Sequence, residues 1–180
     1  PLSAIDSQYY WQWQPCSVVE QDSSFGKYTG TDEPGVMRLS TQLNEMSTSS
    51  LLVCIPNLSP VQQAIWLKKI LHSHPDEDIL FVTLNAWSIS GNEMVTPEQR
   101  AIWGMIKVIA VEQSQQHIAV IDLVHLDDLT PDMLSQVISG CQMGERWFAW
   151  RENKLLTQRL ILSNGEASPL PLSTFNRSGW

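Results

Sequence analysis

Cysteine is scarce in this sequence, and the three cysteines lie far apart. Cys16, Cys54 and Cys141 form no CxxC pair. Such pairs supply ligands to structural zinc sites and form redox-active disulfides. The spacing therefore predicts neither kind of site, and reduced thiols are typical of a cytoplasmic protein.

Long apolar runs and an excess of positive charge are also missing. No run approaches the ~20 apolar residues that span a bilayer, and residues 1–4 have neither the basic nor the apolar region of a signal peptide. The 11 Lys and Arg residues against 19 Asp and Glu residues give a net charge of −8. Because like charges repel, we expect no general attraction to nucleic acid or to an anionic membrane.

The residues that are present are typical of a globular domain. The 180 residues are 43% hydrophobic and 17% charged, which predicts one folded domain with a sizeable core. Aromatic residues alternate with glutamine from position 10 to 14, the pattern of a strand with one buried face. Residues 16–49 are rich in Ser, Thr, Gly, Asp and Glu, and we expect no strand there and at most a short helix near 36–46.

From residue 50 onward, short apolar runs alternate with amphipathic segments. The runs predict strands buried on both faces, at 51–55, 79–84 and 118–124. A Ser-Pro or Thr-Pro pair precedes each amphipathic segment and predicts a helix start, giving helices at 60–72, 97–113 and 133–139. Two closing strands, at 146–151 and 155–162, are joined by the tight turn Glu152-Asn153. This order predicts an α/β fold with a mostly parallel sheet flanked by helices and a C-terminal hairpin.

The segments after the predicted strands do not suit a coenzyme. A dinucleotide fold needs glycines after its first strand so that the backbone can approach the pyrophosphate, but Pro56 and Asn57 follow strand 51–55. Trp87 follows the second strand and would block a phosphate, and Asp127 and Asp128 follow the third and would repel one. We therefore expect no nucleotide at these strand ends.

Other candidate chemistry has a simpler interpretation. His72 and His74 could form a metal pair, but no third ligand is indicated nearby, and histidine commonly contacts the last carbonyls of a helix. His125 and the acids at 127–128 could act as a general base with its orienting group, although a solvated turn is favoured. Glu112 could be a lone acid, with surface pairing favoured. No GxSxG motif is present. We expect no catalytic residue and no metal ligand in the chain.

Tryptophan is abundant, with eight residues. We expect core positions for Trp66 and Trp103, which lie on predicted helices. Indoles on the opening and closing strands could stack on a ligand or pack in the core, and we predict that they contact another domain. These four are Trp11, Trp13, Trp147 and Trp150.

Several segments resemble one known family. The segment TPEQRAIWGMIKVIAVE at 96–112 resembles a signature of the N-terminal, structural subdomain of ketoreductases in modular type I polyketide synthases. That signature has a proline, an aromatic-Gly pair in a helix and an Ala-x-Glu end. Residues 121–123 are similar to the Val-Asp-Leu strand that follows it, and residues 147–160 to a closing hairpin that ends in Arg-Leu. Residues 9–15 look like the aromatic opening strand of the subdomain.

The resemblance implies a fold and a division of the chain. It implies a truncated Rossmann-like fold over residues 1–162, with 16–49 as an irregular or degenerate first unit in place of the family's extra strand–helix unit. Residues 163–180 would be a linker toward a catalytic subdomain that is absent from this chain.

The resemblance also implies a function. The chain would be a non-catalytic scaffold that braces the NADPH-dependent catalytic half of a ketoreductase in polyketide biosynthesis. Its partners in cis would be that half and the neighbouring synthase domains, with the acyl carrier protein involved only indirectly. NADPH would belong to the partner, and no cofactor to this chain.

Three alternatives remain open from the sequence. The chain could be the front half of an active 3-ketoacyl reductase, or a degenerate pseudo-ketoreductase domain in a module that lacks reduction. It could also be a stand-alone α/β binding domain similar to a response regulator. That fold needs clustered acids at strand ends, where only Asp127 and Asp128 come near, because Asp122 lies inside its strand.

Overall fold

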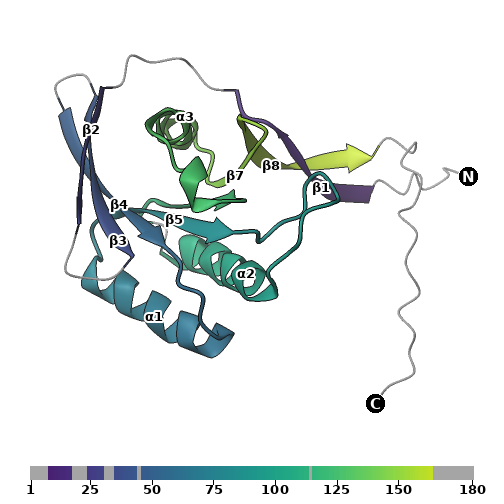
Figure 1. Cartoon of the computed structure of the whole chain (residues 1–180), viewed down its shortest axis with the longest axis horizontal. Helices are drawn as coiled ribbons and strands as arrows, with labels where there is room; N and C mark the ends of the chain where they lie inside the picture. Colours follow the sequence, from purple (N-terminus) through teal and green to yellow (C-terminus); the bar gives the residue numbers. More distant parts are fainter. Residues whose placement is uncertain (1–7, 18–23, 31–34, 44–45, 114, 164–180) are drawn as a thin grey trace, which may run out of the picture.

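One mixed β-sheet runs through the protein (Figure 1). The computed structural model describes residues 8–17, 24–30, 35–43, 46–113 and 115–163. Over these residues the sheet has the strand order β1-β8-β7-β6-β5-β4-β3-β2. The strands are β1 (Gln8–Pro15), β2 (Ser24–Gly30), β3 (Val36–Leu43), β4 (Met46–Cys54), β5 (Asp78–Leu84), β6 (Ile118–Leu123), β7 (Trp147–Arg151) and β8 (Lys154–Ser163). The helices are α1 (Pro60–Ser73), α2 (Pro97–Glu112) and α3 (Pro131–Gln142), and a 3-10 turn spans Leu126–Asp128.

The centre of the sheet is parallel. Strands β4, β5, β6 and β7 pair in sequence order, each parallel to the next. All six residues of β6 and five of the seven in β5 are buried, as a strand covered on both faces requires. The predicted α/β fold is confirmed, whereas the predicted mostly parallel sheet is parallel only in these middle strands and antiparallel toward both edges.

Each helix begins directly after its Ser-Pro or Thr-Pro serine or threonine, although α3 (Pro131–Gln142) is longer at both ends than the predicted range 133–139. Ser59 forms a capping box with Gln62, whose side-chain oxygen accepts a hydrogen bond from the Ser59 N–H at 3.3 Å. The Thr130 hydroxyl accepts a hydrogen bond from the Met133 N–H at 3.3 Å. In each helix a proline stands in the first turn, where its missing N–H costs nothing.

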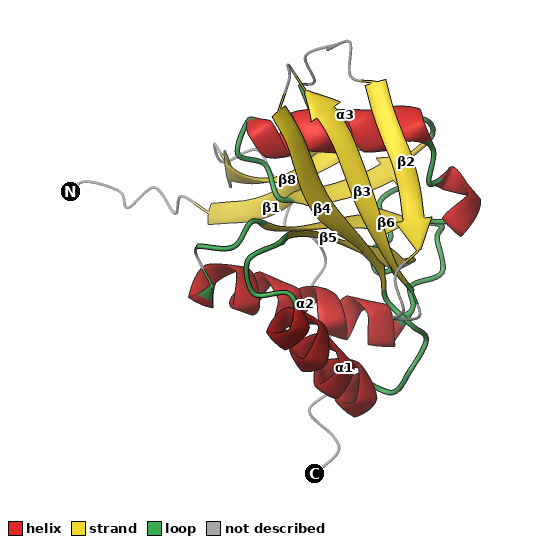
Figure 2. Ribbon diagram, turned by 90° about the vertical axis from the view of Figure 1, so that its left-hand side faces the viewer, coloured by secondary structure: helices red, strands yellow, loops and turns green. Residues whose placement is uncertain are grey.

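The helices cover the sheet from both sides. Helices α1 and α2 lie on one face and α3 on the other (Figures 1 and 2). All three crossovers advance one strand in the same direction, from β4 to β7, so the β6–α3–β7 crossover has the opposite hand to the other two. Right-handed crossovers are the rule in parallel sheets, and a change of hand within one sheet is therefore a distinctive feature of this fold.

The prediction for residues 16–49 was wrong. Strands β2 and β3 and the first residues of β4 form an antiparallel extension, in which Ser40 pairs with Ser49 and Thr41 with Thr48. No helix forms near 36–46 in the residues described there. A period-two pattern reveals a strand only when one face is apolar, and β3 and the start of β4 are rich in Ser, Thr and Gln. Main-chain pairing to an existing sheet edge is enough to extend such a segment.

The closing hairpin is confirmed. Glu152 and Asn153 both have positive φ, 51° and 57°, which is the backbone of the two-residue turn that joins β7 to β8. Strand β1 then pairs antiparallel with β8, with Trp11 opposite Leu160. In the described part of the chain, no helix is long and apolar enough to cross a bilayer.

Candidate functional site

The carboxyl ends of the parallel strands are the place where open α/β sheets bind ligands. At this edge Asp122, in the middle strand β6, is fully buried. Its carboxylate accepts hydrogen bonds from the Thr83 hydroxyl at 2.8 Å and from the N–H groups of Ala86 and Trp87 at 2.8 and 3.2 Å. Burial raises the pKa of Asp122, and the hydrogen bonds from Arg151, Ala86 and Thr83 act in the opposite direction.

Arg151, the last residue of β7, is the ionic partner of Asp122. Its Nη2 lies 2.6 Å from the Asp122 carboxylate and also donates to the Trp87 carbonyl at 2.9 Å. Its Nη1 donates to the carbonyls of Asp122 and Trp150, and its Nε donates to Glu93 at 3.0 Å. The guanidinium is thus enclosed by acceptors from two strands and from the loop that follows β5.

Glu93 closes that loop on itself. Its Oε2 accepts hydrogen bonds from the N–H groups of Ile89 and Ser90, at 2.7 and 2.9 Å, and from the Ser88 hydroxyl at 3.2 Å. Burial would raise the pKa of Glu93, but the hydrogen bonds from Ser90, Ile89 and Arg151 outweigh it and bring the pKa to about 2. The carboxylate is therefore ionised at neutral pH.

These contacts fill the carboxyl edge of the parallel strands with the chain's own side chains. Four backbone N–H groups of the loop after β5 are bonded to Asp122 and Glu93. In a nucleotide-binding sheet, free N–H groups in such loops bind phosphate oxygens. Here the chain's own carboxylates take those donors.

Trp87 lies in a cluster of three indoles beside this edge. The rings of Trp13, Trp87 and Trp103 meet edge to face, with centroids 5.9 to 6.1 Å apart. The Arg100 guanidinium lies over the outer side of the Trp87 ring, 4.4 Å from its centroid. The Trp87 side chain thus belongs to the apolar core, where it links β1 to α2.

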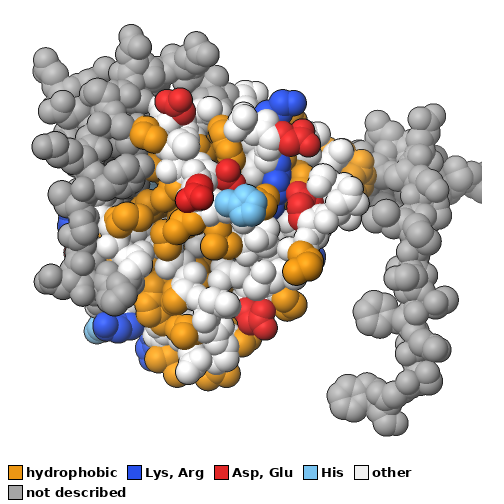
Figure 3. All heavy atoms as spheres, viewed as in Figure 1, with side chains coloured by type: hydrophobic (Ala, Val, Ile, Leu, Met, Phe, Trp, Pro, Cys, Tyr) orange, Lys and Arg blue, Asp and Glu red, His pale blue; other side chains and the backbone are white. Residues whose placement is uncertain are grey.

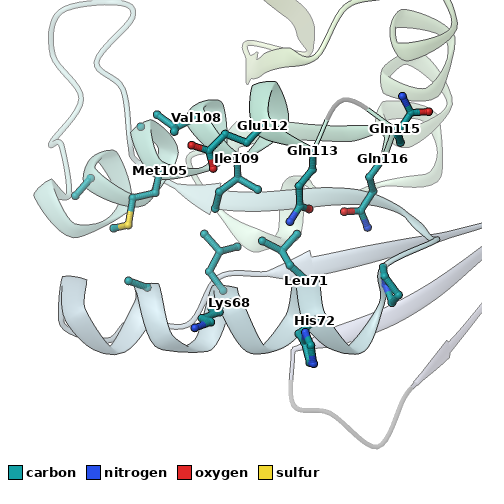
Figure 4. Close-up of a pocket in the computed structure, with 15 residues that line it drawn as sticks. Lys68, Leu71, His72, Met105, Val108, Ile109, Glu112, Gln113, Gln115 and Gln116 are labelled. Atoms are coloured by element: carbon teal, nitrogen blue, oxygen red, sulfur yellow. The ribbon is translucent and has the colours of Figure 1, made fainter.

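A second feature is an open groove between α1 and α2. It has a volume of about 1040 Å³, and its floor includes Leu71 of α1 and Ile109 of α2, which point toward one another (Figure 4). Beside it α2 exposes Val108 (57%) and Val111 (76%), and α1 exposes Ile65 (67%). Hydrophobic side chains are also visible over the α1 and α2 side of the molecule in Figure 3. A helix face this apolar, with no covering element among the described residues, is typical of a protein–protein contact.

The rim of the groove is polar at one end. Lys68 and His72 stand on α1, and Glu112 stands on α2 (Figure 4). Gln116 anchors this end, since its side-chain amide donates to the carbonyls of His74 and Glu77 at 2.7 Å.

The four tryptophans predicted to contact another domain have different environments. Trp11 is exposed (58%), whereas Trp13 and Trp147 pack partly against the core under α1 and α2. Trp150 lies in the core on the α3 side, already covered by this chain. The Lys107 ammonium lies 5.1 Å from the Trp11 ring centroid and 5.2 Å from that of Trp147, which connects α2 to the outer strands. Contact with another domain stays a prediction, for which Trp11 has the accessible surface.

Of the two tryptophans predicted for the core, Trp103 is fully buried, and Trp66 packs against the core with part of its ring exposed.

The remaining candidates do not assemble into a site. His74 pairs with Glu77 at 3.1 Å, and His125 begins the 3-10 turn at Leu126–Asp128, where its N–H donates to Asp128. Among the described residues, no group of three His, Cys, Asp or Glu side chains is placed to hold a metal ion.

Sequence reasoning missed the contacts of Arg151 and Glu93. One signal was available, because a charged residue inside a buried apolar strand requires a partner, and Asp122 is such a residue. The partner itself could not be named, since Arg151 is 29 residues away and Glu93 lies in a loop.

With this geometry established, comparisons place the fold. No protein-family model and no curated protein sequence matches the chain. Among solved structures, the chain is similar to the ketoreductase PlmKR1 from the first module of phoslactomycin biosynthesis in Streptomyces sp. HK803. The TM-score is 0.52 at 14% identity, over 86% of this chain and 37% of that one. The chain has the fold of part of a ketoreductase.

Two further solved ketoreductases overlap a smaller part of the chain. A C2-type ketoreductase from a modular polyketide synthase has a TM-score of 0.47 at 30% identity, over 61% of this chain and 24% of that one. An A-type ketoreductase has a TM-score of 0.47 at 23% identity, over 56% and 22%. This chain thus spans well under half of each of these three ketoreductase structures.

Proposed function

We propose that this chain is a non-catalytic scaffold domain of a polyketide synthase ketoreductase. The observation that carries the proposal is the occupied sheet edge. A dinucleotide does not fit there, because Asp122 and Glu93 hold the loop N–H groups that would bind phosphate, and because their charge would repel it. The chain keeps a Rossmann-like architecture, but the loop N–H groups at its carboxyl edge are bonded to the chain's own carboxylates.

The groove between α1 and α2 is the proposed docking surface, and its occupant is the catalytic half of the ketoreductase. This chain corresponds to 37% of PlmKR1, so most of a ketoreductase lies outside it. The exposed aliphatic side chains Val108, Val111 and Ile65 would be buried on docking, which is the largest favourable term in association. Trp11 offers a second, smaller contact surface on β1.

The coenzyme belongs to the partner in this proposal. NADPH would supply the hydride for reduction of a 3-ketoacyl group bound to the catalytic half. The residues of this chain would hold that half in place, and neighbouring synthase domains would be partners in cis. The acyl carrier protein would meet this chain only indirectly. We further propose a cytoplasmic location, where the three cysteines would stay reduced.

The test is complex formation with the catalytic half, expressed as a separate chain from the same synthase. The expected result is a one-to-one complex by size-exclusion chromatography with light scattering. Val108→Asp should weaken the complex by more than about tenfold, because an ionised carboxylate would be desolvated in an apolar contact. Trp11→Ala tests the second surface.

Met94→Asp is the matched control. Met94 is 89% exposed and lies outside the groove, so this variant should bind as the wild type does. Absence of a complex with the wild-type chain, or equal binding by Val108→Asp and the wild type, would contradict the docking proposal.

A further inference from the structure

The Glu93 carboxylate lies in a site with the chemistry of an anion receptor. The N–H groups of Ile89 and Ser90 converge on one carboxylate oxygen, joined by the Ser88 hydroxyl. The guanidinium of Arg151 donates to the other oxygen at 3.0 Å. Successive N–H groups that converge on one point, with a cation beside them, are the usual components of an oxyanion site in proteins.

This site differs from the neighbouring one around Asp122 in its access to solvent. The Asp122 side chain is fully buried inside its strand, whereas the Glu93 side chain keeps 14% of its surface. A pocket of about 340 Å³ opens beside it and is lined by Ser90, Glu93 and Arg151. A small solute can therefore reach the donors if Glu93 does not occupy them.

The surrounding charges limit which anion fits. Asp128 and Glu152 line the same pocket, and their negative charge opposes an anion of high charge. The donors themselves are already arranged around a carboxylate. A small monovalent carboxylate such as acetate matches the group that is removed when Glu93 is shortened to alanine.

We propose that this loop is a carboxylate-binding site which Glu93 fills from within, and which takes a free small carboxylate once Glu93 is shortened. The site is formed by the N–H groups of Ile89 and Ser90, the Ser88 hydroxyl and the Arg151 guanidinium. The proposal is independent of which partner covers the groove between α1 and α2.

The experiment compares thermal unfolding of the 180-residue chain in sodium acetate and in sodium chloride of equal ionic strength. Glu93→Ala should melt below the wild type in chloride, because the donors lose their acceptor. Acetate in about tenfold excess over its dissociation constant should raise the melting temperature of Glu93→Ala by about 3–6 °C relative to chloride. Saturation transfer from the protein to the acetate methyl protons, measured by NMR, should be seen with this variant only.

Two variants control for general salt effects. Glu93→Gln keeps the size of the side chain and one acceptor oxygen, so it should fold and should not respond to acetate. Asp76→Ala removes an exposed carboxylate from the turn between α1 and β5 and should behave as the wild type does. Equal acetate shifts in all four proteins, or no shift in Glu93→Ala, would overturn the proposal. If Glu93→Ala does not fold in chloride, folding in acetate supports the proposal and failure in both salts contradicts it.

Discussion

At the scale of single residues, Arg151 links the groups that fill the carboxyl edge of the sheet. All five N–H groups of a guanidinium can donate, and here five acceptors surround them: the carbonyls of Trp87, Asp122 and Trp150, and the carboxylates of Asp122 and Glu93. Lysine could not replace this planar set of donors. The residue thus ties β6, β7 and the loop after β5 together in one hydrogen-bonded unit.

Arg151→Met tests this role. The substitution keeps an unbranched side chain but leaves the Asp122 carboxylate buried without its ionic partner, so we expect a loss of about 3–5 kcal/mol in the free energy of unfolding. Arg159→Met is the control, because Arg159 is half exposed and pairs with Glu145 near the surface, where a loss of about 0–1 kcal/mol is expected. Urea denaturation measures both. Similar losses in the two variants would show that the buried pair is not the stronger one.

At the scale of elements, the packing of α3 against β7 depends on a glycine. A Cβ atom at Gly140 would lie 2.7 and 2.9 Å from two ring carbons of Phe148, which is fully buried in β7. The ring cannot move toward solvent, so the close approach of α3 to β7 requires the missing side chain. Gly104 in α2 is different, because a Cβ atom there would meet nothing within 4 Å.

The two glycines should therefore respond oppositely to the same substitution. Gly140→Ala should destabilise the chain by about 1–2 kcal/mol, since overpacking exceeds the gain in helix propensity. Gly104→Ala should stabilise it by about 0.5–1 kcal/mol, because only the propensity gain remains. Chemical denaturation of the two variants measures this difference, and stabilisation of both would refute the packing argument.

The elements also show where sequence reasoning succeeds. Helices α1, α2 and α3 and strands β5 and β6 were predicted because apolar periodicity and Ser-Pro or Thr-Pro pairs are local signals. Strands β2 and β3 were not, because their polar sequences carry no apolar alternation, and main-chain pairing with each other and with β4 forms them. The hairpin turn at Glu152 and Asn153 was predicted from two residues alone, because its backbone is a local property.

At the scale of the whole molecule, a Rossmann-like fold does not by itself imply a coenzyme site. The parallel strands and the crossovers make a Rossmann-like sheet, yet its carboxyl edge is filled by the chain's own charged groups. Exposed aliphatic side chains on α1 and α2 lie away from this edge, and they include Ile65, Val108 and Val111. This arrangement is the basis of the proposal that the chain holds another protein and binds no nucleotide.

The corresponding prediction concerns the isolated chain. Titration with NADPH should give no saturable change in tryptophan fluorescence or in coenzyme fluorescence at concentrations that saturate an intact ketoreductase. Trp87 lies beside the carboxyl edge of the sheet, so its fluorescence should change if a coenzyme binds there. Saturable binding by the chain alone would contradict the scaffold proposal, and loss of that binding in Arg151→Met would place it at this edge.

The sequence by itself determined the α/β class, the order of the central strands and helices and the absence of a glycine-rich phosphate loop. These properties depend on residues close together in the chain, through hydrophobic period, capping and turn chemistry. Only the tertiary structure decided that Asp122, Glu93 and Arg151 meet, that α3 lies on the opposite face from α1 and α2, and that Trp150 is covered. Those outcomes depend on how distant segments pack, and a buried charge shows that it needs a partner without showing which residue that partner is.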